Sequence, residues 1–366
     1  MHPPIPSGSA RLQQGPGGVS PAPLPSLRAG AGPAAAVSTL DRLLAAARIV
    51  LPPEILKAGQ PASDLTPSGA PLEAAFVWAD SEPGCDPRIS LDPAPGAQPE
   101  SRLEAALSLC RAVSGTEPAP DVLRLAKRLS CWQQRAGCRY GAWAGLRPGE
   151  AGGLAAKLYL EVASLIDAKG RPLWAAFEER LAGVPPVLAG RNLRPTMAGV
   201  TPDGGLLELY YRTDPLFAGD LDTLMTRFGL VPRGQEVRRL VERLTGRSVR
   251  FEIPSSDIGF SVAFRLAGEG RAQRARAVAF TFYSNAAALL GPDARIADAL
   301  LAEGAARGWD MTAYRQAFAA FDTWHSEGEA PLQRHGLIGM VLAGEEPPRV
   351  TATLALPVPH TGGRDG

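Results

Sequence analysis

The sequence predicts an α+β fold in which about ten antiparallel strands close into one barrel and helices surround it. Two observations support this prediction. Strand-like and helix-like segments follow one another in pairs (strand, strand, helix, helix) about five times along the 366 residues. Every predicted strand alternates between a face of bulky apolar side chains and a face of small, polar or tyrosine side chains. Ten strands would be unusually many for one open sheet, so closure is favoured over a flat sheet with water on one side.

The first half of the chain supplies two strand pairs and the helices that follow them. Its strands are identified by alternation, and the turn-rich stretch SEPGCDP separates the first two. They cover residues 72–78, 88–92, 140–147 and 156–162. Its helices are identified by apolar residues at three- and four-residue spacing. They cover residues 101–113, 120–131 and 173–181.

The second half repeats the pattern and begins with a hairpin around the turn TPDGG. Its predicted strands cover residues 193–198, 206–212, 258–266, 277–283, 337–342 and 349–356. Its predicted helices cover residues 216–228, 234–245, 296–307 and 311–324. The alternation predicts buried side chains facing the helices at Leu158, Leu160, Phe260, Val262 and Phe280. It places Lys157, Tyr159 and Ser261 on the opposite face, toward the interior of the barrel.

Composition limits the classes of protein to consider. Hydrophobic residues make up 45% of the chain, enough for a large core, and the net charge of +1 gives no footprint for nucleic acid or an anionic membrane. No apolar run is long enough to span a membrane. Four cysteines and four histidines match no zinc pattern, so we expect a cytoplasmic protein without metal or cofactor. We expect a monomer or a homodimer. Residues 1–36 are predicted to be a disordered Pro/Gly/Ala-rich leader, 37–359 one barrel domain, and 360–366 a tail.

Six segments together resemble one known family. They are PLEAAFVW, DPRISLDP, YGAWAGLR, KLYLEV, LLELYYR and GFSVAF, in this order, and the resemblance extends over about residues 40–357. The chain resembles the aromatic prenyltransferases of the ABBA, or dimethylallyltryptophan synthase, type, especially the bacterial indole prenyltransferases. The resemblance implies the prenyltransferase barrel. It also implies transfer of a dimethylallyl or longer prenyl group from a prenyl diphosphate to an indole, a tryptophan-like compound or peptide, or another electron-rich aromatic, by Friedel-Crafts alkylation in secondary metabolism.

The resemblance also assigns candidate site residues. Glu73 in PLEAAF corresponds to the catalytic carboxylate that contacts the acceptor and helps to remove its proton. In this family lysine and arginine side chains bind the diphosphate in place of Mg²⁺, and tyrosines shield the carbocation. The sequence contains no DDxxD-like run, which agrees with a metal-independent reaction. The candidate diphosphate-binding residues are Arg88, Lys157, Tyr159, Tyr210 and Arg349.

The chain departs from the family pattern where the diphosphate would bind. Many members have arginine-x-lysine-x-tyrosine where this chain has Leu206, Glu208 and Tyr210. On later strands Ala263 and Thr353 stand where members have tyrosines. Glu208 would repel a diphosphate, by about 4 kcal/mol per charge pair at contact in an intermediate dielectric. The site therefore has fewer cations and fewer tyrosines than the family pattern.

Several interpretations of these departures stay open. Arg212 and Arg265 compensate, or diphosphate binding is weak or lost. In the second case the barrel is a ligand-binding protein, or it catalyses another reaction on an aromatic substrate with Glu73 or Glu208 as the base. Arg88 could also simply pair with a neighbouring aspartate on the surface, where such a pair contributes little.

Overall fold

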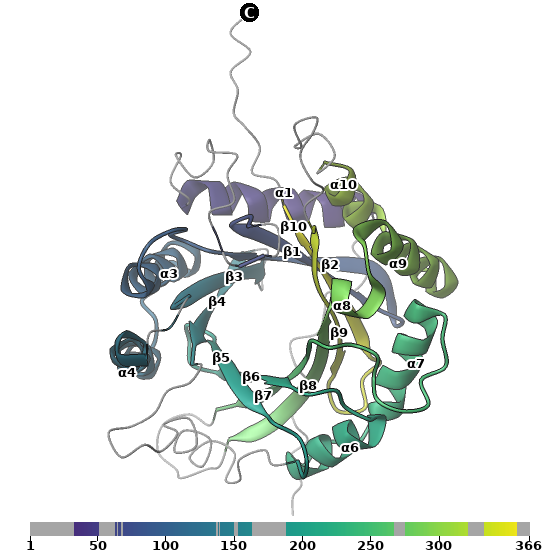
Figure 1. The fold of residues 1–366 in the computed structure, drawn as a ribbon. Coiled ribbons are helices and arrows are strands. Elements are labelled where there is room, and N and C mark those ends of the chain that lie inside the picture. The colour runs from purple at the N-terminus through teal and green to yellow at the C-terminus, as the bar shows by residue number, and fades with distance from the viewer. Residues whose placement is uncertain are drawn as a thin grey trace, which may run out of the picture.

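The computed structural model describes residues 33–50, 63, 65–66, 69–136, 138, 140–149, 153–162, 188–266, 275–320 and 333–356. Within these ranges ten strands form one closed antiparallel barrel, in which each strand pairs with its neighbours in the chain and β1 pairs with β10 (Figure 1). The predicted closure is therefore confirmed. The strands are β1 Leu72–Ala79, β2 Glu82–Leu91, β3 Ala142–Pro148, β4 Leu154–Glu161, β5 Arg194–Val200, β6 Leu206–Thr213, β7 Ile258–Arg265, β8 Arg276–Asn285, β9 His335–Leu342 and β10 Arg349–Ala355.

Helices surround the ring of strands (Figure 1). They are α1 Pro33–Val50, α3 Pro99–Ser114, α4 Pro120–Ala136, α6 Ala218–Arg227, α7 Gly234–Thr245, α8 Ala286–Leu290, α9 Asp293–Arg307 and α10 Thr312–Ala320. Because successive strands are antiparallel, the chain enters helices α3, α6 and α8 at the same end of the barrel, after β2, β6 and β8. We call that end the helix rim. The opposite end carries the turns of the strand pairs, such as β1–β2 and β9–β10, and we call it the hairpin rim.

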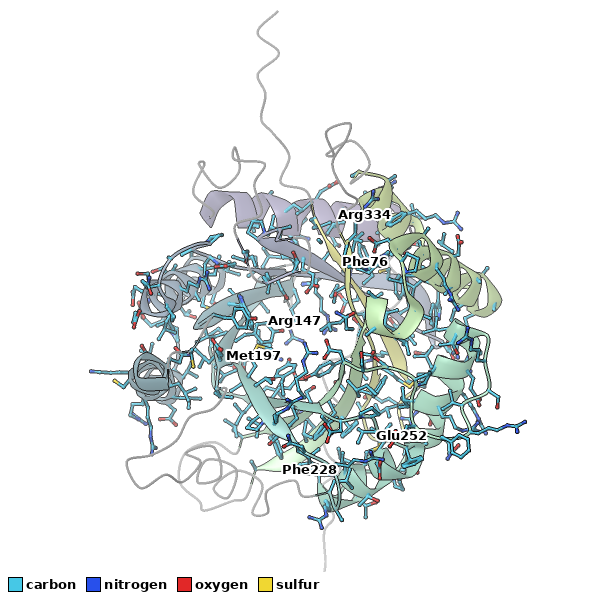
Figure 2. The ribbon with its side chains drawn as sticks, viewed as in Figure 1. Phe76, Arg147, Met197, Phe228, Glu252 and Arg334 are labelled. Carbon is cyan, nitrogen blue, oxygen red and sulfur yellow. The ribbon has the colours of Figure 1, made fainter. Side chains whose placement is uncertain are left out.

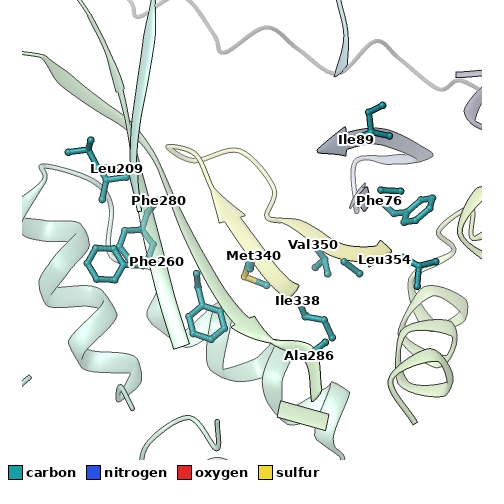
Figure 3. Packing of buried hydrophobic residues seen from close by; sticks show 14 of the residues in the cluster. Phe76, Ile89, Leu209, Phe260, Phe280, Ala286, Ile338, Met340, Val350 and Leu354 are labelled. Atoms are coloured by element: carbon teal, nitrogen blue, oxygen red, sulfur yellow. The ribbon is translucent and has the colours of Figure 1, made fainter. Parts of the chain in front are cut away.

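The outer face of the barrel forms the hydrophobic core with the helices. Apolar side chains from neighbouring strands pack there, as Figure 3 shows for Leu209, Phe260, Phe280 and Met340, each at most 1% exposed. The Phe260 ring stacks on Tyr211 at 4.8 Å and on Phe280 at 5.3 Å between ring centroids. Burial of one such side chain stabilises the fold by about 1.5–3 kcal/mol. The five side chains predicted to be buried, Leu158, Leu160, Phe260, Val262 and Phe280, are all at most 1% exposed.

The second strand begins earlier than predicted. β2 starts at Glu82, so most of the stretch SEPGCDP is strand and not turn. Its first half pairs with β1, for instance Pro87 with Phe76, whereas β3 pairs only with Ile89–Leu91. Among the described residues, the first half of β2 therefore has one side without a paired strand, and a proline, which lacks the N–H donor, is tolerated there.

Other differences concern the helices and the ends of the chain. Helices α1 and α8 were not predicted, and α1 begins at Pro33, inside the predicted leader. The helix predicted over residues 173–181 lies outside the described residues, as do most of the leader and the whole tail. In the described residues no helix is both long enough and apolar enough to cross a membrane.

Candidate functional site

A cluster of polar side chains gathers inside the barrel around Lys157 on β4. Its ammonium donates to the carboxylate of Glu208 and to the hydroxyl of Tyr210, the latter at 3.1 Å. The Ser261 hydroxyl donates to the other carboxylate oxygen of Glu208. The side chains of Lys157 and Glu208 are 17% and 13% exposed, so the ion pair is largely removed from water. Lys157 therefore faces the barrel interior, as the alternation predicts.

The two partners keep each other charged. Burial alone would lower the pKa of Lys157, but the charge and hydrogen bond of Glu208 together with Tyr159 outweigh it, so the pKa is raised. Burial would raise the pKa of Glu208, but Lys157 and the hydrogen bond from Ser261 lower it below its ordinary value. Both groups are therefore ionised near neutral pH. Burial and the adjacent Glu208 raise the pKa of Tyr210 well above its ordinary value, so its hydroxyl stays protonated.

Tyrosine rings lie beside this ion pair. The Lys157 ammonium lies 4.9 Å from the centre of the Tyr159 ring and 5.5 Å from that of Tyr210, within cation–π range. The Tyr210 ring contacts Tyr159 edge-on at 6.0 Å and Tyr283 at 6.4 Å between centroids. Three tyrosines from β4, β6 and β8 thus present ring faces and edges inside the barrel.

Glycines on neighbouring strands make room for these large side chains. A Cβ atom at Gly145 would lie 2.8 Å from the Tyr159 ring, and one at Gly199 would meet the Lys157 side chain at 2.5 Å. A Cβ atom at Gly259 would overlap the ring of Tyr283. Real Cβ contacts are essentially never this short, so each glycine keeps free the space that its neighbour's side chain occupies.

Two arginines lie on adjacent strands near the cluster. Arg88 on β2 donates to Asp86 at 2.9 Å, and its side chain stays 35% exposed. Burial would lower the pKa of Arg88, but Asp86 raises it above its ordinary value, and Tyr159 and Glu208 act in the same direction. Arg88 is therefore paired with its aspartate neighbour and also lies within electrostatic reach of the Lys157 cluster. The second arginine, Arg147 on β3, lies within the ring of strands in Figure 2.

Glu73 is the candidate catalytic carboxylate on β1. Glu73 pairs with Ala355 on β10, two residues from Thr353. The Thr353 hydroxyl accepts the Leu337 N–H at 2.7 Å and hydrogen-bonds to Glu73. Burial raises the pKa of Glu73 from 4.5 to about 7, and the Thr353 hydrogen bond offsets only part of this rise. A carboxyl group with this pKa can accept or release a proton near neutral pH.

The strand end beside Glu73 is fixed from outside the barrel. Asp293, the first residue of α9, accepts the backbone N–H groups of Arg334 and His335 and contacts the His335 ring at 2.5 Å. The other ring nitrogen of His335 lies 2.9 Å from the Tyr314 hydroxyl on α10. The next residue, Gly336, lies directly against the Glu73 carboxylate, where a Cβ atom would clash. Helices α9 and α10 thus fix the backbone next to Gly336, against which the Glu73 carboxylate packs.

The remaining candidate cations are held elsewhere. Arg349 pairs with Glu346 at 2.6 Å at the hairpin rim, and Arg212 pairs with Asp257 at the helix rim. Within the described residues no ion pair or hydrogen bond joins either arginine to Lys157. The structure thus brings together Arg88, Lys157, Tyr159 and Tyr210 but not Arg349. In the described part of the chain no group of three or more His, Cys, Asp or Glu side chains has the arrangement of a metal site.

Three interior residues were missed by sequence reasoning. Tyr283 and Arg147 were not named as site residues, although each lies on the small or polar face of an alternating strand, which is the available signal. Thr353 was treated only as a missing tyrosine, whereas it binds Glu73. Its role depends on the pairing of β1 with β10, which no local pattern shows.

Comparison with solved structures identifies the fold. The 5-dimethylallyl tryptophan synthase from Streptomyces coelicolor in complex with DMASPP and Trp superimposes with a TM-score of 0.66 at 20% identity, covering 87% of this chain and 88% of that one. Prenyltransferase PriB in its apo form gives 0.63 at 14%, covering 87% and 96%. AnaPT from Neosartorya fischeri gives 0.56 at 12%, covering 82% of each chain. No protein-family model and no curated protein matches the sequence. The chain therefore has the ABBA-type barrel fold found in these aromatic prenyltransferases.

Proposed function

We propose that this protein is an aromatic prenyltransferase that transfers a prenyl group from a prenyl diphosphate to an electron-rich aromatic acceptor such as an indole. One observation carries the proposal. A single barrel interior contains a carboxyl group with a pKa of about 7, cationic side chains and three tyrosines. These are the groups that such a transfer needs: a base, an anion site and a shield for a carbocation.

The arrangement supports a division of the interior into two parts. Strand β6, which carries Glu208 and Tyr210, lies five places from β1 in either direction around the ring, so it stands across the barrel from Glu73. In our proposal the diphosphate binds near Arg88 and Lys157, with hydrogen bonds from Tyr159 and Tyr210. The aromatic acceptor lies on the side of Glu73.

The proposed reaction breaks the allylic C–O bond and forms a C–C bond. The electron pair of the C–O bond leaves with the diphosphate, and the cationic side chains stabilise its charge. The rings of Tyr159, Tyr210 and Tyr283 stabilise the allylic cation through their faces. The aromatic ring attacks this cation, and Glu73, which accepts the acceptor's N–H, takes up the proton released when aromaticity returns.

The solved structures support the substrate classes in this proposal. Two dimethylallyltryptophan synthases of this fold were crystallised with DMASPP and Trp. We extend these classes, a dimethylallyl diphosphate and a tryptophan-like acceptor, to this chain as part of the proposal. Because side chains supply the cations in this scheme, we expect turnover to continue in the presence of EDTA.

One observation favours a second candidate function. Lys157 is already bound by Glu208, so the cation available to a diphosphate is weakened. A barrel that does not bind diphosphate would bind an aromatic ligand, or would catalyse another reaction on it with Glu73 or Glu208 as the base. The two candidates differ in whether a prenyl diphosphate binds at all.

The test is incubation of the full chain with dimethylallyl diphosphate and tryptophan or indole, with and without EDTA. We expect prenylated product and equimolar diphosphate. Glu73→Gln should reduce turnover by about 10²–10⁴-fold, the usual effect of losing a general base, with little change in diphosphate binding. Lys157→Ala should mainly weaken diphosphate binding, by about 1.5–3 kcal/mol. Failure to bind any prenyl diphosphate would refute the proposal and favour the second candidate.

A further inference from the structure

Arg147 lies on the interior face of β3, next to Arg88. The pairing of β2 with β3 joins Ile89 to Leu146, and the same register continued by one residue brings Arg88 opposite Arg147. Arg147 is half-buried, and Figure 2 shows it inside the ring of strands. Two guanidinium groups therefore stand on adjacent strands of the same interior.

The surroundings of the two arginines differ. Asp86 binds Arg88 directly, whereas Arg147 forms neither a hydrogen bond nor an ion pair with any residue in the described ranges. Burial lowers the pKa of Arg147, and the positive charge of Arg88 lowers it further; Asp86, Tyr159 and Asp203 raise it by less. Two like charges held together repel each other, and an anion bound between them would relieve that repulsion.

The third interior cation is less available. Lys157 donates to Glu208, which Ser261 and Tyr210 also hold in place by hydrogen bonds. An anion approaching Lys157 therefore meets a fixed negative charge. In the described part of the chain no carboxylate contacts Arg147 directly, so an anion can approach its guanidinium without displacing an ion pair.

We propose that Arg147 binds the diphosphate together with Arg88 and supplies the positive charge that Glu208 takes from Lys157. This inference rests on the proposed function, because it assigns a further residue to the diphosphate site of that reaction. A guanidinium group binds a phosphate through two parallel N–H donors. Two guanidinium groups on adjacent strands suit the two phosphates of a diphosphate, one for each.

The test is calorimetric titration of the full chain with inorganic pyrophosphate and, separately, with orthophosphate. Arg147→Gln removes the charge and keeps a polar side chain. Arg147→Lys keeps the charge but lacks the two parallel N–H donors of the guanidinium group. The matched control is Arg124→Gln on α4, where the side chain is 72% exposed and paired with Asp121. Urea denaturation of each variant checks that the fold is intact.

Arg147→Gln should bind pyrophosphate about 10- to 100-fold more weakly than the wild type, the range for loss of a charge-assisted hydrogen bond. Its affinity for orthophosphate should fall less than threefold, because Arg88 still binds a single phosphate. Arg147→Lys should recover part of the loss, and Arg124→Gln should match the wild type. Pyrophosphate affinity within twofold of the wild type in Arg147→Gln, or equal losses for both anions, would overturn the inference while the proposed function stands. If the wild type itself binds no pyrophosphate, the inference fails, and the proposed function fails with it only if dimethylallyl diphosphate does not bind either.

Discussion

The raised pKa of Glu73 has a consequence for stability that can be measured without substrate. An unfolded glutamate loses its proton near pH 4.5, whereas folded Glu73 keeps it until about pH 7. The unfolded state therefore releases this proton first as the pH rises, so folding becomes less favourable through this range and levels off above pH 7. The rise of the pKa from 4.5 to about 7 corresponds to a loss of about 3 kcal/mol of folding free energy.

Glu73→Gln removes this pH-dependent loss, because glutamine does not ionise. Between pH 5 and pH 8 the wild type should lose about 2.5 kcal/mol more of its folding free energy than the variant does. Comparing the two proteins at both pH values cancels the effects of the substitution that do not depend on pH, as well as the titration of all other groups. Urea denaturation of the full chain at pH 5 and pH 8 measures the difference.

The control is Glu345→Gln, which changes an exposed carboxylate on the turn between β9 and β10. Because this variant keeps Glu73, its loss of folding free energy between pH 5 and pH 8 should equal that of the wild type. If the wild type and Glu73→Gln differ by less than about 1 kcal/mol in the folding free energy they lose between pH 5 and pH 8, Glu73 is not a buried carboxyl group with a raised pKa. The same variant should be catalytically impaired, so this position is expected to trade stability for activity.

Two further predictions concern the groups around the reaction centre. Glu208→Gln removes a negative charge beside Lys157; at about 6 Å and a dielectric constant of about 20 such a charge opposes an anion by about 3 kcal/mol. Pyrophosphate affinity, measured by calorimetry, should therefore rise at least tenfold, and an unchanged affinity would show that the anion does not bind near Lys157. Thr353→Val removes the hydrogen bond that lowers the pKa of Glu73. In Thr353→Val the acidic limb of the pH profile of kcat/KM should therefore move to higher pH. Thr353→Ser keeps a hydroxyl group and should leave this limb in place. An unmoved limb in Thr353→Val would contradict the assignment of Glu73 as the base.

The barrel could be predicted from the sequence because the alternation within each strand shows by itself which side chains pack against the helices. The outer face must fill the space under helices and is bulky, as at Phe260 and Phe280, whereas the inner face is small or polar. Helix α1 was missed because it begins inside the predicted leader and its first residues, like those before it, are rich in alanine. Its buried residues Ala36, Leu40, Leu43 and Ala47 do follow helical spacing, which is the signal that could have identified it.

The site could be predicted only in part, because its contacts join distant segments. The alternation places Lys157 on the interior face, but its pairing with Glu208, 51 residues later, depends on the register of β4, β5 and β6. The pKa of Glu73 depends on burial and on Thr353, and Gly336 leaves the space for its carboxylate; both residues come from the last two strands of the barrel. A local pattern shows which face a side chain occupies and not which side chain it meets there.

The balance of charge in the interior links these observations. Among the described residues of the cluster, Arg88, Arg147 and Lys157 carry positive charge, while Asp86 and Glu208 carry negative charge and each binds one of those cations. This leaves a surplus of one positive charge, and it belongs to Arg147 because the other two cations are paired. A diphosphate carries more negative charge than this surplus neutralises. Its affinity should therefore depend on Arg147 and Glu208 as well as on Lys157. In our proposal Arg147, on the strand next to Arg88, offsets the negative charge that Glu208 introduces where many members of the family pattern have lysine.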